Sequence, residues 1–151
     1  MTEKQDANKQ TRRHGHCLCG AVTFSAIPSN TETGVCHCDM CRRWSAGPFF
    51  AIDCGDSVIF ENKDDLHVYR SSDWGERGFC GKCGTVLFWN LHGKEAYSMS
   101  LSAFDDIDND NVTFTSEIFI DEKPDYFSFA NDTKKMTGAE VFAMFASGQS
   151  N

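Results

Sequence analysis

The stretch VCHCDMCRRW, residues 35–44, places three thiols within six positions. In an extended segment residues i and i+2 point to the same face, so Cys36 and Cys38 can aim their sulfurs at one point while His37 faces the other way. A turn after these residues would bring Cys41 beneath them. Zinc–sulfur bonds of about 2.3 Å in a tetrahedron need sulfurs roughly 3.8 Å apart, and this spacing can supply that locally. The stretch therefore predicts a metal site with three protein thiolates and one further coordination position.

Four other cysteines form a second candidate group, which combines a CxC and a CxxC pair: Cys17, Cys19, Cys80 and Cys83. Four thiolates fill a tetrahedron, so this set is typical of a structural zinc that joins distant strands. The alternative is that Cys80 and Cys83 form a thioredoxin-like redox pair, but the chain around them lacks the βαβ pattern of that fold. Spacing alone leaves open which pair completes which site.

The eighth cysteine, Cys54, decides whether the site around residues 36–41 is open or closed. If Cys54 folds back onto that site, it supplies the fourth ligand and the site becomes structural. The interpretation we favour is a small buried hydrophobic side chain at the end of a strand, which is the commoner fate of a lone cysteine.

The composition excludes several classes of protein. The chain has 151 residues, enough to bury a core, and a formal net charge of −8, which disfavours nucleic acid as a partner. The opening residues 1–16 lack an apolar segment, so we expect neither a secretory signal nor a membrane span. Eight cysteines then indicate metal or redox chemistry in a reducing compartment, and we predict a cytoplasmic protein. We expect His14 and His16 to form hydrogen bonds within the cysteine loop rather than to bind metal.

The pattern of apolar residues predicts a mainly β fold with a short helix at Asp39–Ser45 that Gly47-Pro48 ends. The residues before 14 read as a mobile tail, and Pro28–Gly34 reads as a connector rich in turns. The expected strands are residues 21–24, 49–53, 57–61, 66–70, 77–80, 85–90, 96–101, 112–115 and 117–120.

A second short helix is predicted near the C-terminus. Thr137 and Glu140 have the spacing of a capping box, apolar residues follow at helical spacing, and Gly148 supplies the end. We expect its apolar side to pack on the β core, with a dimer or partner contact as the alternative.

Several charged and aromatic residues near the thiols are candidates for supporting roles. At least one of Arg42 and Arg43 is placed to screen thiolate charge or to bind a carboxylate. Trp44, Phe49 and Phe50 are expected in the core. Asp105-Asp106 suggests paired carboxylates, but adjacent side chains diverge, so a turn is the better interpretation.

With these residues in place, the chain resembles the glutathione-dependent formaldehyde-activating enzyme family, which also includes centromere protein V. The resemblance spans roughly Gly15 to Ala130 and depends on the order and spacing of four segments: GHCLCGAV (15–22), CHCDMCR (36–42), FCGKCGTVLFW (79–89) and IFIDEKPDY (118–126).

The resemblance implies stacked antiparallel sheets with two zinc ions. It assigns Cys17, Cys19, Cys80 and Cys83 to a structural zinc, and Cys36, Cys38 and Cys41 to a catalytic zinc. It implies a domain over residues 14–130. The composition places a tail at 1–13 before this domain, and the capping box places a helical extension at 131–151 after it. The implied partners are a small-molecule thiol such as glutathione and a small aldehyde such as formaldehyde, with no nucleic acid and no membrane.

Two classes of function follow. The leading hypothesis is a zinc-dependent carbon–sulfur lyase or synthase that acts on the thiol adduct of a small aldehyde, with S-(hydroxymethyl)glutathione as the first adduct to test. The alternative is a non-catalytic zinc-stabilised binding module, as centromere protein V suggests; handling of thiols or metal without turnover is a third possibility. The number of sulfur ligands on each ion separates an open site from a closed one.

Overall fold

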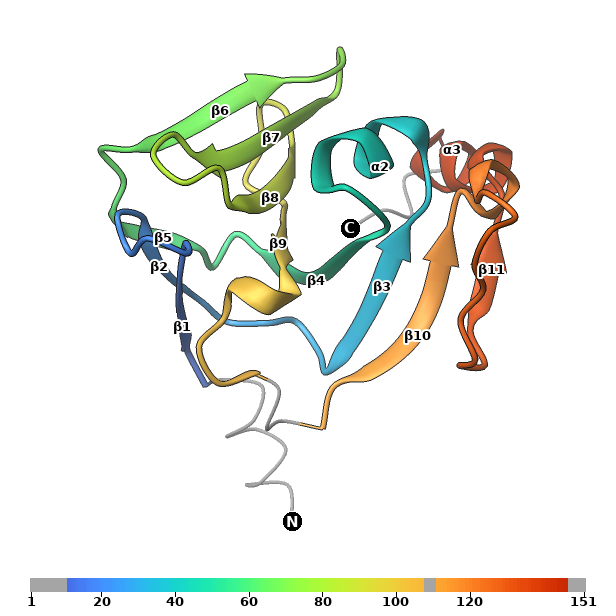
Figure 1. Cartoon of the computed structure of the whole chain (residues 1–151), viewed down its shortest axis with the longest axis horizontal. Coiled ribbons are helices and arrows are strands. Elements are labelled where there is room, and N and C mark those ends of the chain that lie inside the picture. The colour runs from blue at the N-terminus through green and yellow to red at the C-terminus, as the bar shows by residue number, and fades with distance from the viewer. Residues whose placement is uncertain (1–10, 108–110, 147–151) are drawn as a thin grey trace. The chain divides into compact units, whose positions relative to one another are not determined.

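The computed structural model describes residues 11–107 and 111–146, and its contacts divide the chain into two compact units (Figure 1). Unit 1 comprises Met1–Thr31 and Ala51–Val112, and unit 2 comprises Glu32–Phe50 and Thr113–Asn151. Strands dominate the described residues, which confirms the mainly β class. No helix in these ranges is long and apolar enough to cross a membrane.

Unit 1 contains two antiparallel groups of strands. The first is a sheet in the order β1-β2-β5, made of β1 (Arg13–His16), β2 (Thr23–Ala26) and β5 (Ile59–Asn62). The second runs in the order β4-β9-β8-β7-β6, made of β4 (Phe49–Gly55), β9 (Tyr97–Ser100), β8 (Val86–Leu91), β7 (Gly75–Cys80) and β6 (Leu66–Arg70). The 3₁₀ turn η1 (Leu101–Ala103) follows β9. Strand β4 begins in unit 2 and continues into unit 1.

Side chains from both groups share one hydrophobic core in unit 1. Phe24 of β2 and Phe88 of β8 are buried, and the ring of Phe60 in β5 lies 6.3 Å from the first and 5.6 Å from the second, measured between centroids. A Cβ atom on Gly78 would come within 2.1 Å of the Phe88 ring, so only glycine allows β7 and this ring to pack. The stacking of antiparallel sheets is therefore confirmed in unit 1.

Unit 2 is built on parallel strands instead. Strand β10 (Thr113–Ile118) lies between β3 (Glu32–Cys36) and β11 (Lys134–Met136) and pairs with both in parallel. Figure 1 shows the arrowheads of β3 and β10 pointing the same way. Unit 2 also contains α2 (Asp39–Ser45), the 3₁₀ turn η3 (Ile120–Glu122) and α3 (Gly138–Ala146). The fold thus contains both kinds of pairing, because the strands of unit 2 pair in parallel whereas those of unit 1 pair antiparallel.

The predicted connector and strand boundaries needed three corrections. The connector at residues 28–34 ends early, because β3 takes its last residues into pairing with β10. The two strands expected at 112–115 and 117–120 are one strand, β10, with a shift of register between Phe114 and Ser116. Strand β11 was not predicted.

The N-terminal segment before residue 14 is only partly described. Residues 1–10 of the predicted tail lie outside the described residues. Arg12 donates to the hydroxyl of Ser25 at 3.1 Å and to the carbonyl of Ser57 at 2.9 Å, and Arg13 begins β1. Arg12 and Arg13 of the predicted tail are therefore held within unit 1.

The two predicted helices are present. Helix α2 has the predicted bounds, and Cys38 is its N-cap. At α3, Thr137 accepts from the backbone N–H of Glu140 at 3.2 Å, and the Glu140 carboxylate accepts from the backbone N–H of Thr137 at 2.8 Å. This reciprocal pair confirms the capping box. Gly148, the predicted end of the helix, lies outside the described residues.

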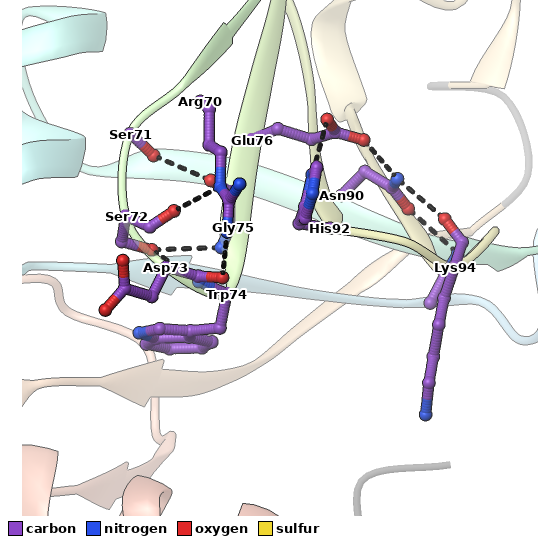
Figure 2. A network of polar contacts seen from close by, with 11 residues as sticks. Arg70, Ser71, Ser72, Asp73, Trp74, Gly75, Glu76, Asn90, His92 and Lys94 are labelled. Carbon is purple, nitrogen blue, oxygen red and sulfur yellow. Dashed lines mark hydrogen bonds and ion pairs between the residues drawn. The ribbon is translucent and has the colours of Figure 1, made fainter.

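A polar network at the ends of β7 and β8 fixes the neighbouring turns (Figure 2). The amide of Asn90 is 1 % exposed and donates to Glu76 at 2.8 Å and to the Lys94 carbonyl at 2.8 Å. Its oxygen accepts from the Ala96 backbone at 2.9 Å. Because partners within the network satisfy both ends of this buried amide, we assign the network to the scaffold.

Candidate metal centres

The first cysteine cluster lies within unit 1, where two turns meet. Cys17 and Cys19 follow β1, Cys80 ends β7, and Cys83 lies in the turn before β8. All four sulfurs lie within 4.8 Å of one another. The distance from the Cys19 sulfur is 3.7 Å to that of Cys17 and 3.8 Å to that of Cys80. These distances match the edge of a tetrahedron with zinc–sulfur bonds of about 2.3 Å.

The two turns have the same local design. A glycine with φ of +81°, Gly20 in one turn and Gly84 in the other, directly follows each cysteine pair. Backbone N–H groups also face the sulfurs: Val22 donates to Cys17 at 3.2 Å and Lys82 donates to Cys80 at 3.3 Å. Left-handed glycines allow the tight turns, and the N–H groups stabilise thiolates there.

Thr85 connects the two turns, and the sequence analysis did not single it out. Its hydroxyl accepts from the backbone N–H of Leu18 at 2.9 Å and lies 3.1 Å from the sulfur of Cys83. Hydrogen bonds from Thr85 lower the pKa of the Cys83 thiol to about 5. Its position directly after the glycine that closes the CxxC turn was the available signal.

The second cluster lies within unit 2 and contains three cysteines. Cys36 ends β3, Cys38 caps α2, and Cys41 lies in the first turn of α2. Their sulfurs lie within 4.8 Å of one another, and the backbone N–H of Cys41 donates to the Cys38 sulfur at 3.4 Å. The local geometry inferred from CxCxxC is therefore present: a strand end followed by a helical turn brings the three sulfurs together.

The donor set of the second cluster fits a soft divalent cation. The sulfurs of Cys38 and Cys41, together with burial, raise the pKa of the Cys36 thiol far above its usual range. Three neighbouring thiolates repel one another, so a cation is needed for all three to ionise. Soft thiolate ligands suit zinc, copper(I) and iron–sulfur clusters, so the donor set is consistent with zinc. Both clusters could thus hold a metal ion.

Cys54 is in neither cluster of the described residues. It is 2 % exposed within the hydrophobic core of unit 1, and its sulfur lies 3.7 Å from the carbonyl of Ile52. Burial raises the pKa of its thiol to about 12, so Cys54 stays neutral. This environment agrees with the interpretation of Cys54 as a small buried hydrophobic residue.

The two arginines after the second cluster have different surroundings. The guanidinium of Arg42 donates to the carbonyl of His37 at 2.9 Å and so braces the loop that carries the thiols. Arg43 pairs with Asp39 one turn earlier at 3.2 Å, and its side chain is 79 % exposed. Arg42 supports the backbone of the cluster, whereas Arg43 forms a surface ion pair of the kind that contributes little to stability.

His37 is not part of the second cluster, although it lies between two of its cysteines. It is fully buried, and its Nε2 atom lies 2.8 Å from a carboxylate oxygen of Glu117 in β10. The other carboxylate oxygen accepts from the hydroxyl of Thr133 at 2.5 Å. Sequence patterns assigned Glu117 only to a strand, because its preceding neighbours Thr115 and Ser116 are polar and give no sign that it is buried.

The remaining candidates lie outside both clusters. His16 pairs with Asp105 at 2.6 Å, and His14 pairs with Glu61 at 3.8 Å, so both histidines have carboxylate partners in unit 1. Asp106 lies 4.0 Å from Arg13. The adjacent carboxylates of the Asp105-Asp106 pair thus serve different partners.

The aromatic residues near the second cluster pack within unit 2. The ring of Trp44 lies 5.3 Å from that of Phe49, and Phe50 lies 5.1 Å from Phe114, measured between centroids. Phe49 is 5 % exposed. Phe49 is therefore buried as expected, whereas Trp44 and Phe50 are only half-buried.

A mainly β protein with one cluster of four cysteines and one of three is therefore the class that the structure defines. The family model described as glutathione-dependent formaldehyde-activating enzyme matches residues 12–122. The chain belongs to this family.

Two individual proteins are also similar. A protein of Schizosaccharomyces pombe described as an uncharacterized lyase is 38 % identical over 128 residues, which cover 84 % of this chain and 92 % of the relative. A solved structure of a Rhodobacter sphaeroides protein aligns with a TM-score of 0.55 at 22 % identity, covering 68 % of this chain and 99 % of the other. The second likeness concerns the fold alone.

Proposed function

We propose that the protein is a zinc-dependent carbon–sulfur lyase or synthase that acts on the thiol adduct of a small aldehyde, with glutathione and formaldehyde as its first candidate pair. The observation that carries this proposal is the cluster of three cysteines in a chain of this family. Three thiolates leave one position of a tetrahedron for a guest. The relative described as a lyase supports the same reaction class.

In this proposal the two clusters have different roles. Cys17, Cys19, Cys80 and Cys83 hold a structural zinc, because four sulfurs saturate the ion. Cys36, Cys38 and Cys41 hold the catalytic zinc. Zinc bound there would supply the positive charge that keeps an incoming thiol ionised near neutral pH.

The reaction forms one carbon–sulfur bond. The thiol loses its proton, its sulfur adds to the carbonyl carbon of the aldehyde, and the electron pair of the broken C=O π bond moves to oxygen, which takes up a proton. The product is the S-hydroxymethyl adduct, and the lyase direction reverses each step. The chain supplies an ordered thiolate platform: the Cys41 N–H bond to Cys38 and the Arg42 brace on the His37 carbonyl hold it before a substrate arrives.

The alternative of a non-catalytic zinc-stabilised binding module keeps both ions but has no turnover.

The eight cysteines are all free in the structure, and together with zinc thiolate sites they favour a reducing compartment; we therefore propose the cytoplasm. We infer no nucleic-acid partner, because the formal net charge is −8.

The test is NMR exchange spectroscopy on glutathione and formaldehyde with the zinc-loaded protein. We expect exchange between free and adduct formaldehyde to be faster than without protein. A Cys38→Ser variant should lose the acceleration. Leu18→Ala, which changes an exposed side chain between two cysteines of the first cluster, should retain it. Uncatalysed exchange rates in the presence of wild-type protein with two zinc ions would exclude this substrate pair.

A further inference from the structure

The loop of the second cluster is held by one neighbouring segment of unit 2. The backbone N–H of His37 donates to the carbonyl of Ile118 at 3.0 Å, and the backbone N–H of Asp39 donates to the carboxylate of Glu122 at 2.9 Å. The His37 ring reaches Glu117 in the same segment. These contacts fix the backbone on both sides of Cys38.

The contact between His37 and Glu117 is the buried member of this set. The side chain of His37 is 0 % exposed and that of Glu117 is 2 % exposed. Among the described residues, the other ring nitrogen of His37, Nδ1, has no hydrogen-bond partner. The polar anchoring of the ring therefore depends on Nε2 and Glu117. A buried carboxylate needs partners for both oxygens, because an unsatisfied buried charge is costly.

The partners that complete Glu117 come from the C-terminal part of the chain. The hydroxyl of Thr133 donates to Oε2 at 2.5 Å, and the ammonium of Lys135 lies 3.7 Å from the same oxygen. Burial raises the pKa of Glu117, but the bonds from Thr133 and His37 and the charge of Lys135 outweigh it, so the net shift is downward. Each carboxylate oxygen of Glu117 thus has its own partner, Nε2 of His37 on Oε1 and the Thr133 hydroxyl on Oε2.

The family match ends at residue 122, so Thr133 and Lys135 lie beyond it. Strand β11 places them beside β10, where Ser116 pairs with Lys134 and Glu117 with Lys135. Nothing in the CxCxxC spacing requires this strand. Its pairing with β10 nevertheless brings the Thr133 hydroxyl and the Lys135 ammonium to the carboxylate of Glu117. That carboxylate contacts His37, which lies between two cysteines of the second cluster.

We propose that Thr133, together with Lys135, positions the second cysteine cluster, by completing a chain of contacts from Thr133 through the buried Glu117 to the buried His37. His37 lies between Cys36 and Cys38 in the chain. Anchoring its ring fixes the backbone at this position, and the backbone sets the directions of the side chains on either side. Thr133, Glu117 and His37 are positioning residues, because they act on the cluster through its backbone. The inference rests on the proposed function only in taking the second cluster as a zinc site.

The experiment measures zinc affinity, not turnover. Protein loaded with two zinc ions is titrated with a competing chelator, and the ion of the second cluster is identified as the one absent from Cys38→Ser. We expect Thr133→Val, which keeps the shape and removes the hydroxyl, to weaken zinc binding at the second cluster by about 10-fold, since partners of this kind tune metal affinity by 10- to 100-fold.

Two matched variants and one internal reference accompany it. Thr133→Ser, which restores a hydroxyl, should bind both ions as the wild type does. Lys134→Ala changes the exposed neighbour in β11 and should have no effect. The ion of the first cluster, in unit 1, should keep its wild-type affinity in every variant.

The outcomes decide the inference. Selective weakening of the second ion in Thr133→Val, restored in Thr133→Ser, supports it. An affinity for the second ion within about 2-fold of wild type overturns it, since that is far below the range for supporting groups. Equal weakening of both ions also overturns it, because it indicates general destabilisation. If the wild-type protein shows no turnover but the variants show this selective change in zinc affinity, the proposed function is refuted and this inference stands.

Discussion

Loss of the first zinc ion should destabilise the fold more than loss of the second, because the two clusters close chain loops of very different length. The perturbation we choose is Cys19→Ser, since Cys19 is the exposed ligand of the first cluster and its replacement leaves no cavity. The comparison is Cys38→Ser in the second cluster, which removes one of three ligands.

The magnitude follows from loop closure. A cross-link lowers the entropy of the unfolded chain by about 2.1 + 1.5R ln n cal/mol/K, where n is the number of residues in the loop. Cys19 and Cys80 are 61 positions apart, which gives about 4 kcal/mol at ~25 °C. The second cluster spans only residues 36–41, which gives about 2 kcal/mol.

The assay is urea unfolding followed by circular dichroism, with the zinc content of each sample measured in parallel. We expect each variant to lose one zinc ion, and Cys19→Ser to lose roughly twice as much unfolding free energy as Cys38→Ser. Leu18→Ala is the control for a change on the surface of the same turn. Equal losses in the two cysteine variants, or a loss below about 1 kcal/mol in Cys19→Ser, would refute the assignment of the first ion as a cross-link between distant strands.

Four further predictions concern the scaffold. Cys54→Ser places a hydroxyl in the core of unit 1 and should cost about 1–3 kcal/mol of unfolding free energy with no change in zinc content. Gly78→Ala puts a methyl group against the Phe88 ring and should cost about 1–3 kcal/mol by urea unfolding. Thr137→Ala removes the cap of α3 and should cost about 1 kcal/mol. Hydrogen bonds from Thr137 lower the pKa of Glu140. The stabilisation by its carboxylate is therefore present above the usual glutamate pKa and is lost as the pH falls through the lowered value. The difference in unfolding free energy between wild type and Glu140→Gln should shrink on acidification.

Three of these predictions have a defined contradicting result. Loss of one zinc ion in Cys54→Ser would mean that Cys54 is a ligand after all. Gly47→Ala adds a methyl group where nothing lies within 4 Å and should be neutral; if Gly78→Ala is equally neutral, the packing argument is wrong. A stability difference for Glu140→Gln that is constant with pH would show that its carboxylate makes no charged contribution.

Much of this protein could be predicted from short-range sequence patterns. CxCxxC brings Cys36, Cys38 and Cys41 together because a strand end followed by a helical turn is a local geometry. The capping box of α3 and the bounds of α2 are equally local. Alternation in an extended segment predicted that His37 would not join its neighbouring thiols, and the second cluster does not include it.

Other features depended on pairing between distant segments. Strand β3 was mistaken in part for a connector because its residues are polar or small, and its pairing with β10 makes it a strand. Strand β11 is three residues long and carries two lysines, so it has no alternation of apolar and polar residues from which a strand could be predicted. Thr85 and Glu117 gained their roles because folding brought Leu18 and His37 to them.

The sequence by itself determined the two sets of thiols, the mainly β class and the family, because metal-ligand spacing and strand patterns are written within a few residues. Only the tertiary structure decided that Cys54 lies in a hydrophobic core and that Thr133 supports the second cluster through Glu117. The physical reason is that burial and long-range hydrogen bonds are properties of neighbours in space, and the order of residues along the chain does not specify those neighbours.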